Sequence, residues 1–175
     1  MVRTKRYKFI YNYGSKNELY DLKDDPQENS NRIDDTDLKD IQKIIQQSGL
    51  SQTIKNQALE IFQNIAEVEA SIHNKPIQDV HLHELGGTDT IVDITGTLLA
   101  LEHLGIKNVT SSPLPLGSGF IQGAHGDIPL PAPATIALLK DVPVYGTEVE
   151  AELVTPTGAA LITYLASDYG PAPKL

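Results

Sequence analysis

One helical stripe constrains the fold of this 175-residue chain more than any other feature. Between Ser51 and Asn74, residues that are apolar with one exception, Glu69, recur at intervals of three or four positions, which places them on one face of an α-helix. Ser51 is suited to cap the start of this helix, and Pro76 lies just beyond its end. The pattern predicts a helix over residues 53–73, which must bury its apolar face. The stripe comprises Ile54, Ala58, Ile61, Phe62, Ile65, Ala66, Glu69 and Ile72.

Shorter segments of helical and strand character surround this helix. We therefore predict an α/β fold in which a small mixed sheet is flanked by four or five helices, with an N-terminal β-hairpin appended. The other helices are expected from Leu38 to just before Gly49, from Thr88 to Gly105, from Pro131 to Lys140 and from Thr155 to about Ser167. The strands of the sheet are expected at residues 79–82, 107–111, 114–121 and 142–146.

The segment from residue 81 to residue 93 carries two imidazoles and three carboxylates, in a chain with only five histidines. On an extended segment His81 and His83 share a face, and on a helix Asp89 and Asp93 share one. Together with Glu84, they form a mixed set that suits a borderline divalent metal such as Ni²⁺, Zn²⁺, Fe²⁺ or Mn²⁺. The same residues would also fit a surface His-x-His pair with carboxylates that cap a helix and face solvent. Spacing alone leaves both interpretations open.

Two further motifs are candidates for binding an anion. Residues 117–119 form a Gly-Ser-Gly turn whose backbone N–H groups could hold a phosphate, although a Gly-x-Gly motif without a Walker lysine is weak evidence. Residues 155–158 open a predicted helix, where N–H groups and the helix dipole favour an anion. Two threonines that merely cap that helix would give the same sequence. The candidate phosphate-binding residues are Gly117, Ser118, Gly119, Thr155, Thr157 and Gly158.

Three of the five histidines lie outside the His-x-His pair. His125 stands between Ala124 and Gly126, and such small neighbours let a ligand approach the backbone, so it is a weaker metal candidate. His73 and His103 fall in the last turns of predicted helices, where an imidazole interacts favourably with the helix dipole. The sequence contains no Gly-x-Ser-x-Gly elbow, and no residue is assigned a catalytic role.

Composition limits the classes of binding partner and the cellular compartment that the chain fits. A formal net charge of −9 argues against nucleic acid, since the one basic cluster lies within residues 3–8. No run of residues is long and apolar enough to predict a membrane span or a secretory signal. The chain has no cysteine, which excludes disulfides and thiolate metal ligands and fits a cytoplasmic setting.

From about residue 37 to residue 175 the chain resembles the LarC family of nickel insertion proteins. The resemblance implies binding of Ni²⁺ and its insertion into a pyridinium dithiocarboxylate mononucleotide, with formation of a carbon–nickel bond. It also implies a requirement for CTP with Mg²⁺ or Mn²⁺. Where the family usually reads His-Phe-His-Glu, this chain reads His-Leu-His-Glu. The blocks that carry the resemblance are Val80–Gly86 with Thr88–Ile94, Ser112–Gly119, Ala124–Gly126, Pro129–Thr135 and Glu152–Ala159.

Residues 1–34 resemble a different protein, the C-terminal hairpin of arylsulfatase-type sulfatases, without any part of the sulfatase catalytic motif. We therefore expect a chimeric chain, with a hairpin and linker over residues 1–34 and a partial nickel insertion domain over residues 37–175. The family's N-terminal region and its C-terminal nucleotide-binding domain are expected to be missing. On this interpretation the chain alone binds metal at best and turns over nothing.

The leading functional hypothesis is nickel binding and delivery to the organic mononucleotide. His81, His83 and Glu84 are the expected ligands, and Asp89 and Asp93 are further ligands or acceptors that orient the imidazoles. Because an imidazole must be neutral to bind metal, affinity should fall as the pH drops through about 6.5. The alternative is a non-catalytic module that binds phosphate or a partner without metal chemistry. The expected protein partner is a second copy of the chain or the missing family domain.

Overall fold

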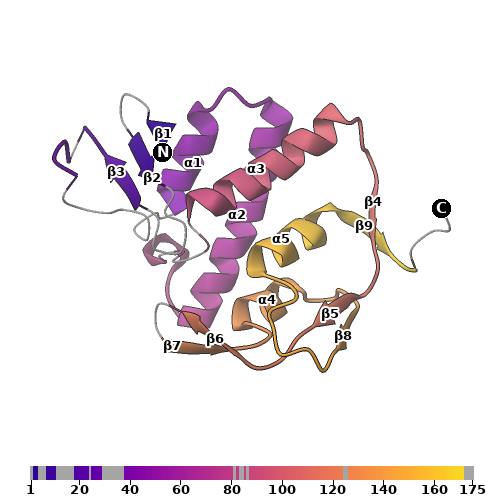
Figure 1. Cartoon of the computed structure of the whole chain (residues 1–175). Coiled ribbons are helices and arrows are strands. Elements are labelled where there is room, and N and C mark those ends of the chain that lie inside the picture. Colours follow the sequence, from indigo (N-terminus) through magenta and orange to yellow (C-terminus); the bar gives the residue numbers. More distant parts are fainter. Residues whose placement is uncertain are drawn as a thin grey trace.

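In this computed structural model, five α-helices in the described part of the chain pack together, with short paired strands at their margins (Figure 1). The longest helix, α2 (Gln52–His73), lies at the centre and contacts each of the other four. These are α1 (Leu38–Gln47), α3 (Thr88–His103), α4 (Pro133–Leu138) and α5 (Pro156–Leu165). The predicted α/β class is confirmed. The structure describes residues 2–3, 7–10, 18–23, 25–28, 38–80, 82, 85, 87–123 and 126–171.

The sequence signals at the two ends of α2 act as predicted. Ser51 precedes the helix, and its side-chain oxygen accepts a hydrogen bond from the backbone N–H of Ile54 at 3.3 Å. Asn74 ends the helix in the left-handed conformation, with φ of 49°, and its N–H donates to the carbonyl of Ser71. The helix predicted over residues 53–73 is therefore confirmed to within one residue.

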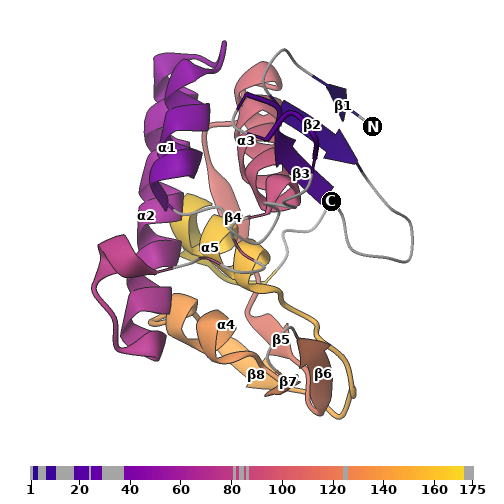
Figure 2. The same ribbon diagram turned by 90° about the vertical axis from the view of Figure 1, so that its left-hand side faces the viewer.

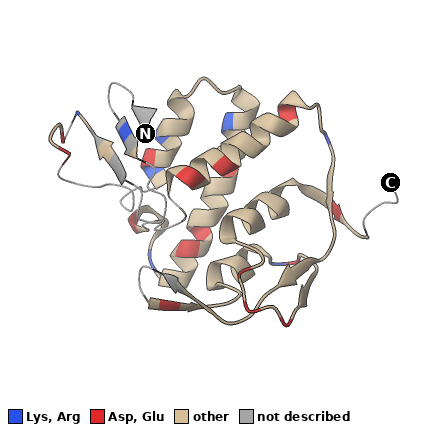
Figure 3. Cartoon of the chain, viewed as in Figure 1, with Lys and Arg blue, Asp and Glu red and all other residues tan. Residues whose placement is uncertain are grey.

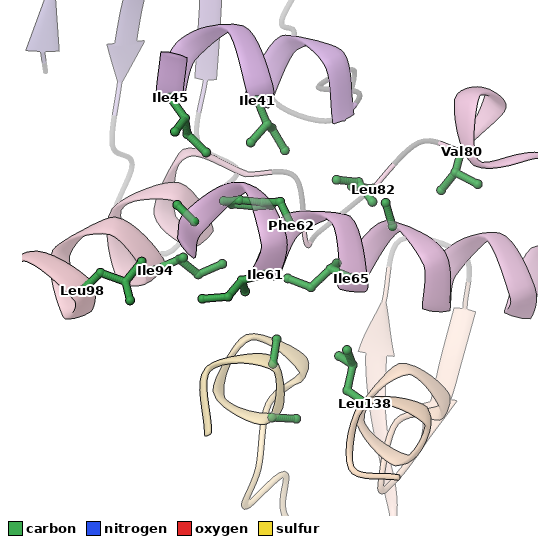
Figure 4. Close-up of a cluster of buried hydrophobic side chains, with 14 of the residues drawn as sticks. Ile41, Ile45, Ile61, Phe62, Ile65, Val80, Leu82, Ile94, Leu98 and Leu138 are labelled. Atoms are coloured by element: carbon green, nitrogen blue, oxygen red, sulfur yellow. The ribbon is translucent and has the colours of Figure 1, made fainter. Parts of the chain in front are cut away.

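The hydrophobic core is built on the stripe of α2. Phe62 is completely buried at the centre of α2, and Ile41 and Ile45 of α1 lie above it (Figure 4). Leu138 of α4 approaches the opposite side of α2. Since each neighbouring helix buries its apolar side chains against α2, this one helix organises the fold. The other helices contribute Ile94 and Leu98 of α3 and Ala159 and Ala160 of α5 to the same cluster.

Six short strands follow α3, and they form separate pairs rather than the single mixed sheet that we predicted. Pro113, which has no N–H to donate to a ladder, separates the first two strands of this region. Figures 1 and 2 both place α1 and the pair formed by β5 and β8 at opposite ends of the molecule. The pairs are β4 (Val109–Ser111) with β9 (Ala166–Tyr169), parallel; β5 (Leu114–Leu116) with β8 (Val144–Gly146), parallel; and β6 (Phe120–Gly123) with β7 (Gly126–Pro129), antiparallel.

Three local predictions are wrong. The strand expected at residues 114–121 is divided into β5 and β6, which belong to different pairs, with residues 117–119 between them. Instead of the strand expected at residues 79–82, the chain forms a 3₁₀ turn, η1 (Ile77–Asp79), after Pro76. The last helix was expected to reach Ser167, but it ends at Leu165, and the next residues form β9. The Ser167 side chain donates to the carbonyl of Val109 at 3.2 Å, so pairing with β4 replaces the last helical turn.

The N-terminal segment contains the two antiparallel strands that the sequence predicts. They are β2 (Tyr7–Ile10) and β3 (Glu18–Asp21), and β1 (Val2–Arg3) adds a third strand beside β2. Tyr20 of β3 is buried. None of the helices in the described residues combines the length and the apolar character that a membrane crossing requires.

A hydrogen bond between α5 and α2 leads to a prediction at high pH. The hydroxyl of Tyr164 donates to Oε2 of Glu60 at 2.6 Å, and burial together with this carboxylate raises the pKa of Tyr164 to about 12. Since the folded chain holds this proton more tightly than the unfolded chain, the stabilisation is complete below pH 10 and is lost as the pH rises towards 12.

The measurement is a difference titration of tyrosinate absorption between the wild-type chain and Tyr164→Phe. We expect the difference spectrum to show one tyrosine that ionises near pH 12. A difference centred near pH 10 would show that Glu60 does not hold this proton.

Candidate functional site

The sequence candidates for metal binding fall mostly outside the described residues. This applies to His81, His83, Glu84 and His125. Two of their neighbours in the sequence are described and are buried. Val80 is 3% exposed and Leu82 is completely buried, and both belong to the core around α2 (Figure 4). The N–H of Leu85 donates to the carbonyl of Leu82 at 2.7 Å. Val80 and Leu82, on either side of His81 in the sequence, are therefore anchored in the core around α2.

The two candidate aspartates stand on α3 as the sequence predicts, four residues apart and both exposed. Asp89 lies in the first turn, and its Oδ1 accepts the N–H of Thr90 at 2.9 Å. Gly87, not Asp89, is the N-cap of this helix, and the Asp89 bond satisfies one N–H of the first turn with one of its two carboxylate oxygens. Within the described part of the chain, no three ligand-type side chains come together to hold a metal.

The Gly-Ser-Gly motif lies at the carboxyl end of β5, beside the carboxyl end of β8. In α/β proteins this edge of a parallel sheet is where ligands commonly bind. The two strands continue to bond to each other beyond their ends: the N–H of Thr147 donates to Leu116 at 2.9 Å, and the N–H of Ser118 donates to Val149 at 2.9 Å. The N–H of Ser118 is thus engaged with the neighbouring backbone in this structure.

Gly117 is required here by close packing. A Cβ atom at this position would lie 1.8 Å from the carbonyl oxygen of Ala151, which is far inside van der Waals contact. The glycine therefore lets two backbone segments meet, and this is a structural reason for the motif beside the predicted phosphate role.

The second anion motif begins α5 and is reached by the segment that follows β8. Thr155 is the N-cap of α5, and its hydroxyl oxygen accepts the N–H of Gly158 at 3.1 Å. Thr157 lies in the first turn and is partly exposed. Residues 147–154 contact the Gly-Ser-Gly turn and then enter α5, so the structure places the two motifs at either end of one segment.

The electrostatic surroundings of this edge are acidic. Figure 3 shows acidic residues along the segment between β8 and α5, which contains Glu148, Glu150 and Glu152. Between residues 108 and 171 the sequence contains one lysine, Lys140, and no arginine. A phosphate at this edge would therefore depend on backbone N–H groups rather than on positive side chains.

One pair of residues was not singled out by sequence reasoning as a site. Glu69 is only 8% exposed, and its Oε2 lies 3.2 Å from Nε2 of His73, one helical turn further along α2. Burial raises the pKa of Glu69, and the charge and hydrogen bond of His73 counteract that rise. The available signal was the presence of a glutamate within an otherwise apolar stripe, followed four residues later by histidine.

Comparison with known proteins places these observations in context. A family model described as nickel insertion protein matches residues 3–175. A pyridinium-3,5-bisthiocarboxylic acid mononucleotide nickel insertion protein of Desulfitobacterium hafniense strain DCB-2 is 48% identical over 138 residues, which is 79% of this chain and 34% of the relative. A protein of Dictyoglomus thermophilum, whose name assigns nickel insertion provisionally, is 56% identical over 130 residues, with 74% of this chain and 34% of the relative covered.

The extent of these matches matters for their interpretation. This chain spans about a third of the length of these curated relatives. No solved structure matches it. The family match includes residues 3–34, and the division into residues 1–34 and 37–175, with a sulfatase-like hairpin in the first part, stays a prediction.

Proposed function

We propose that this chain, which belongs to the nickel insertion protein family, binds Ni²⁺ and delivers it to a pyridinium dithiocarboxylate mononucleotide. The observation that carries the proposal is the family match over residues 3–175, supported by relatives whose names state this substrate. Nickel is the cargo here. CTP with Mg²⁺ or Mn²⁺ belongs to the proposed reaction only through the family resemblance.

We assign the nickel ligands to the His-Leu-His-Glu segment. In this assignment His81, His83 and Glu84 bind the ion, and His125 is a weaker candidate. Asp89 and Asp93 either bind directly or accept hydrogen bonds that orient the imidazoles. The anchoring of Val80 and Leu82 in the core supports the proposal, because it ties this segment to a rigid helix.

The ligand atoms of the protein and of the substrate favour transfer of Ni²⁺ from the protein to the substrate. Imidazole and carboxylate are borderline and hard ligands, whereas the sulfur atoms of a thiocarboxylate are softer and favour a late transition metal such as nickel. A site of nitrogen and oxygen donors can therefore release Ni²⁺ to the substrate. We assign the phosphate of the mononucleotide to the turn of Gly117, Ser118 and Gly119 or to the first turn of α5 at Thr155, Thr157 and Gly158. The N–H of Ser118 would reach it only by exchanging its bond to Val149.

The test is calorimetric titration of Ni²⁺ into the wild-type chain and into a His81→Ala/His83→Ala variant. We expect affinity to fall by more than about 100-fold, because even the loss of a residue that only orients a ligand costs up to that much. Affinity for the wild-type chain should also weaken as the pH drops through about 6.5, since a protonated imidazole cannot bind metal.

His103→Ala is the matched control, because His103 is an exposed histidine in the last turn of α3 and should leave affinity unchanged. Equal affinity in the wild-type chain and the double variant would remove the ligand assignment. Binding of phosphate or a nucleotide without any binding of Ni²⁺ would favour the alternative, a non-catalytic anion-binding module at the carboxyl edge of β5 and β8.

A further inference from the structure

Glu69 occupies a position that is unfavourable for a carboxylate. It is 8% exposed and lies near the carboxyl end of α2, where the helix dipole is negative. Removing a carboxylate from water is costly unless a cation or a hydrogen-bond donor compensates for the lost hydration. In this structure His73 provides that compensation, with its Nε2 3.2 Å from the Glu69 oxygen. A divalent metal would compensate for the same charge more strongly.

The geometry of the pair matches that of two adjacent metal ligands. Two ligand atoms that are each about 2.1 Å from a metal, at angles of about 90–110°, lie roughly 3.0–3.4 Å apart. The observed distance of 3.2 Å between Oε2 and Nε2 falls within this range. Residues four apart on a helix also share a face, which is the spacing that the two histidines of an HExxH motif use to bind zinc.

Solvent reaches the pair through His73. The side chain of His73 is 40% exposed, so water molecules can complete the coordination of an ion. In Figure 4 Leu82 lies beside Ile65, and Val80 lies farther along α2, towards the end that carries Glu69 and His73. Val80 therefore lies towards the same end of α2 as the pair.

We propose that Oε2 of Glu69 and Nε2 of His73 form a second divalent-metal site, which binds Ni²⁺ separately from His81, His83 and Glu84. The identity of the ion rests on the proposed function of the chain. Both protein ligands belong to one rigid helix, and water supplies the remaining ligands. Such a site binds more weakly than one with three or more protein ligands.

The experiment measures Ni²⁺ stoichiometry and affinity by calorimetry in the full chain and its variants. In the His81→Ala/His83→Ala background we expect one weaker Ni²⁺ site to remain. Adding either Glu69→Gln or His73→Ala should weaken that remaining site by at least about tenfold. Glu69→Gln preserves the side-chain volume and the His73 side chain is 40% exposed, so far-UV circular dichroism should show both variants folded.

One matched control lies on α2 itself and the other on α3. Glu67→Gln changes an exposed glutamate of α2, and His103→Ala changes an exposed histidine of α3, and neither should alter the remaining site. If the His81→Ala/His83→Ala variant binds no Ni²⁺, or if Glu69→Gln and His73→Ala leave its binding unchanged, the second site is overturned. Loss of all binding through Glu69→Gln alone, with no effect of His81→Ala/His83→Ala, would support the pair and remove the ligand assignment under the proposed function.

Discussion

Replacing Phe62 by alanine should lower the free energy of unfolding by about 4 kcal/mol, within the range measured for large aromatic residues in protein cores. Phe62 is completely buried and stands at the centre of α2, facing α1 (Figure 4). Removing the ring loses its transfer free energy and also leaves a cavity that rigid helices on both sides of α2 cannot fill. Urea denaturation followed by circular dichroism measures this difference.

Ile72→Ala is the matched control for Phe62→Ala. Ile72 lies on the same helix but is 41% exposed, so its truncation should cost much less than the loss of a buried ring. Equal losses from the two substitutions would show that the centre of α2 is not the core of the folded chain.

Gly117→Ala should destabilise the chain by about 3 kcal/mol, at the upper part of the range typical for overpacking. The added methyl group would meet a backbone carbonyl, that of Ala151, at 1.8 Å, so a change of side-chain rotamer cannot relieve the clash. The two segments must separate, which would break the bond from the Ser118 N–H to Val149. We therefore expect a lower urea midpoint and faster hydrogen exchange at Ser118.

The control for this substitution is Gly146→Ala at the end of β8. A Cβ atom there would meet nothing within 4 Å, so the change should be nearly neutral or slightly stabilising. If Gly117→Ala behaves like Gly146→Ala, the close approach to Ala151 is not present in the folded chain.

The helices of this fold could be predicted because their signals are local. The spacing of apolar residues, the cap at Ser51 and the end at Asn74 all lie within or next to α2, and the structure confirms each of them. The strands could not be paired in the same way, because β4 bonds to β9 across most of the second half of the chain. That long-range pairing is also what ends α5 at Leu165, where local preference alone predicts two more helical residues.

The candidate site shows the same division between local and long-range information. The sequence identifies ligand types such as His81 and His83, but it cannot show which chain segment approaches a glycine. Gly117 was interpreted as part of a phosphate cradle, and only the fold shows Ala151 against it. Likewise, a glutamate within an apolar stripe was visible at Glu69, but its pairing with His73 at 3.2 Å requires the folded helix.

The central position of α2 has a consequence for cooperativity. The other four helices each use α2 as a packing partner, so no helix can detach without exposing part of the same apolar stripe to water. Detachment of any one helix is therefore coupled to global unfolding. Rearrangements that accompany binding are confined to parts of the chain that do not pack against α2. The ribbon formed by β6 and β7 is such a part, since it pairs only within itself among the described strands and exposes Phe120. The molecule thus combines a helical body that opens as one unit with a peripheral strand ribbon that can adjust independently.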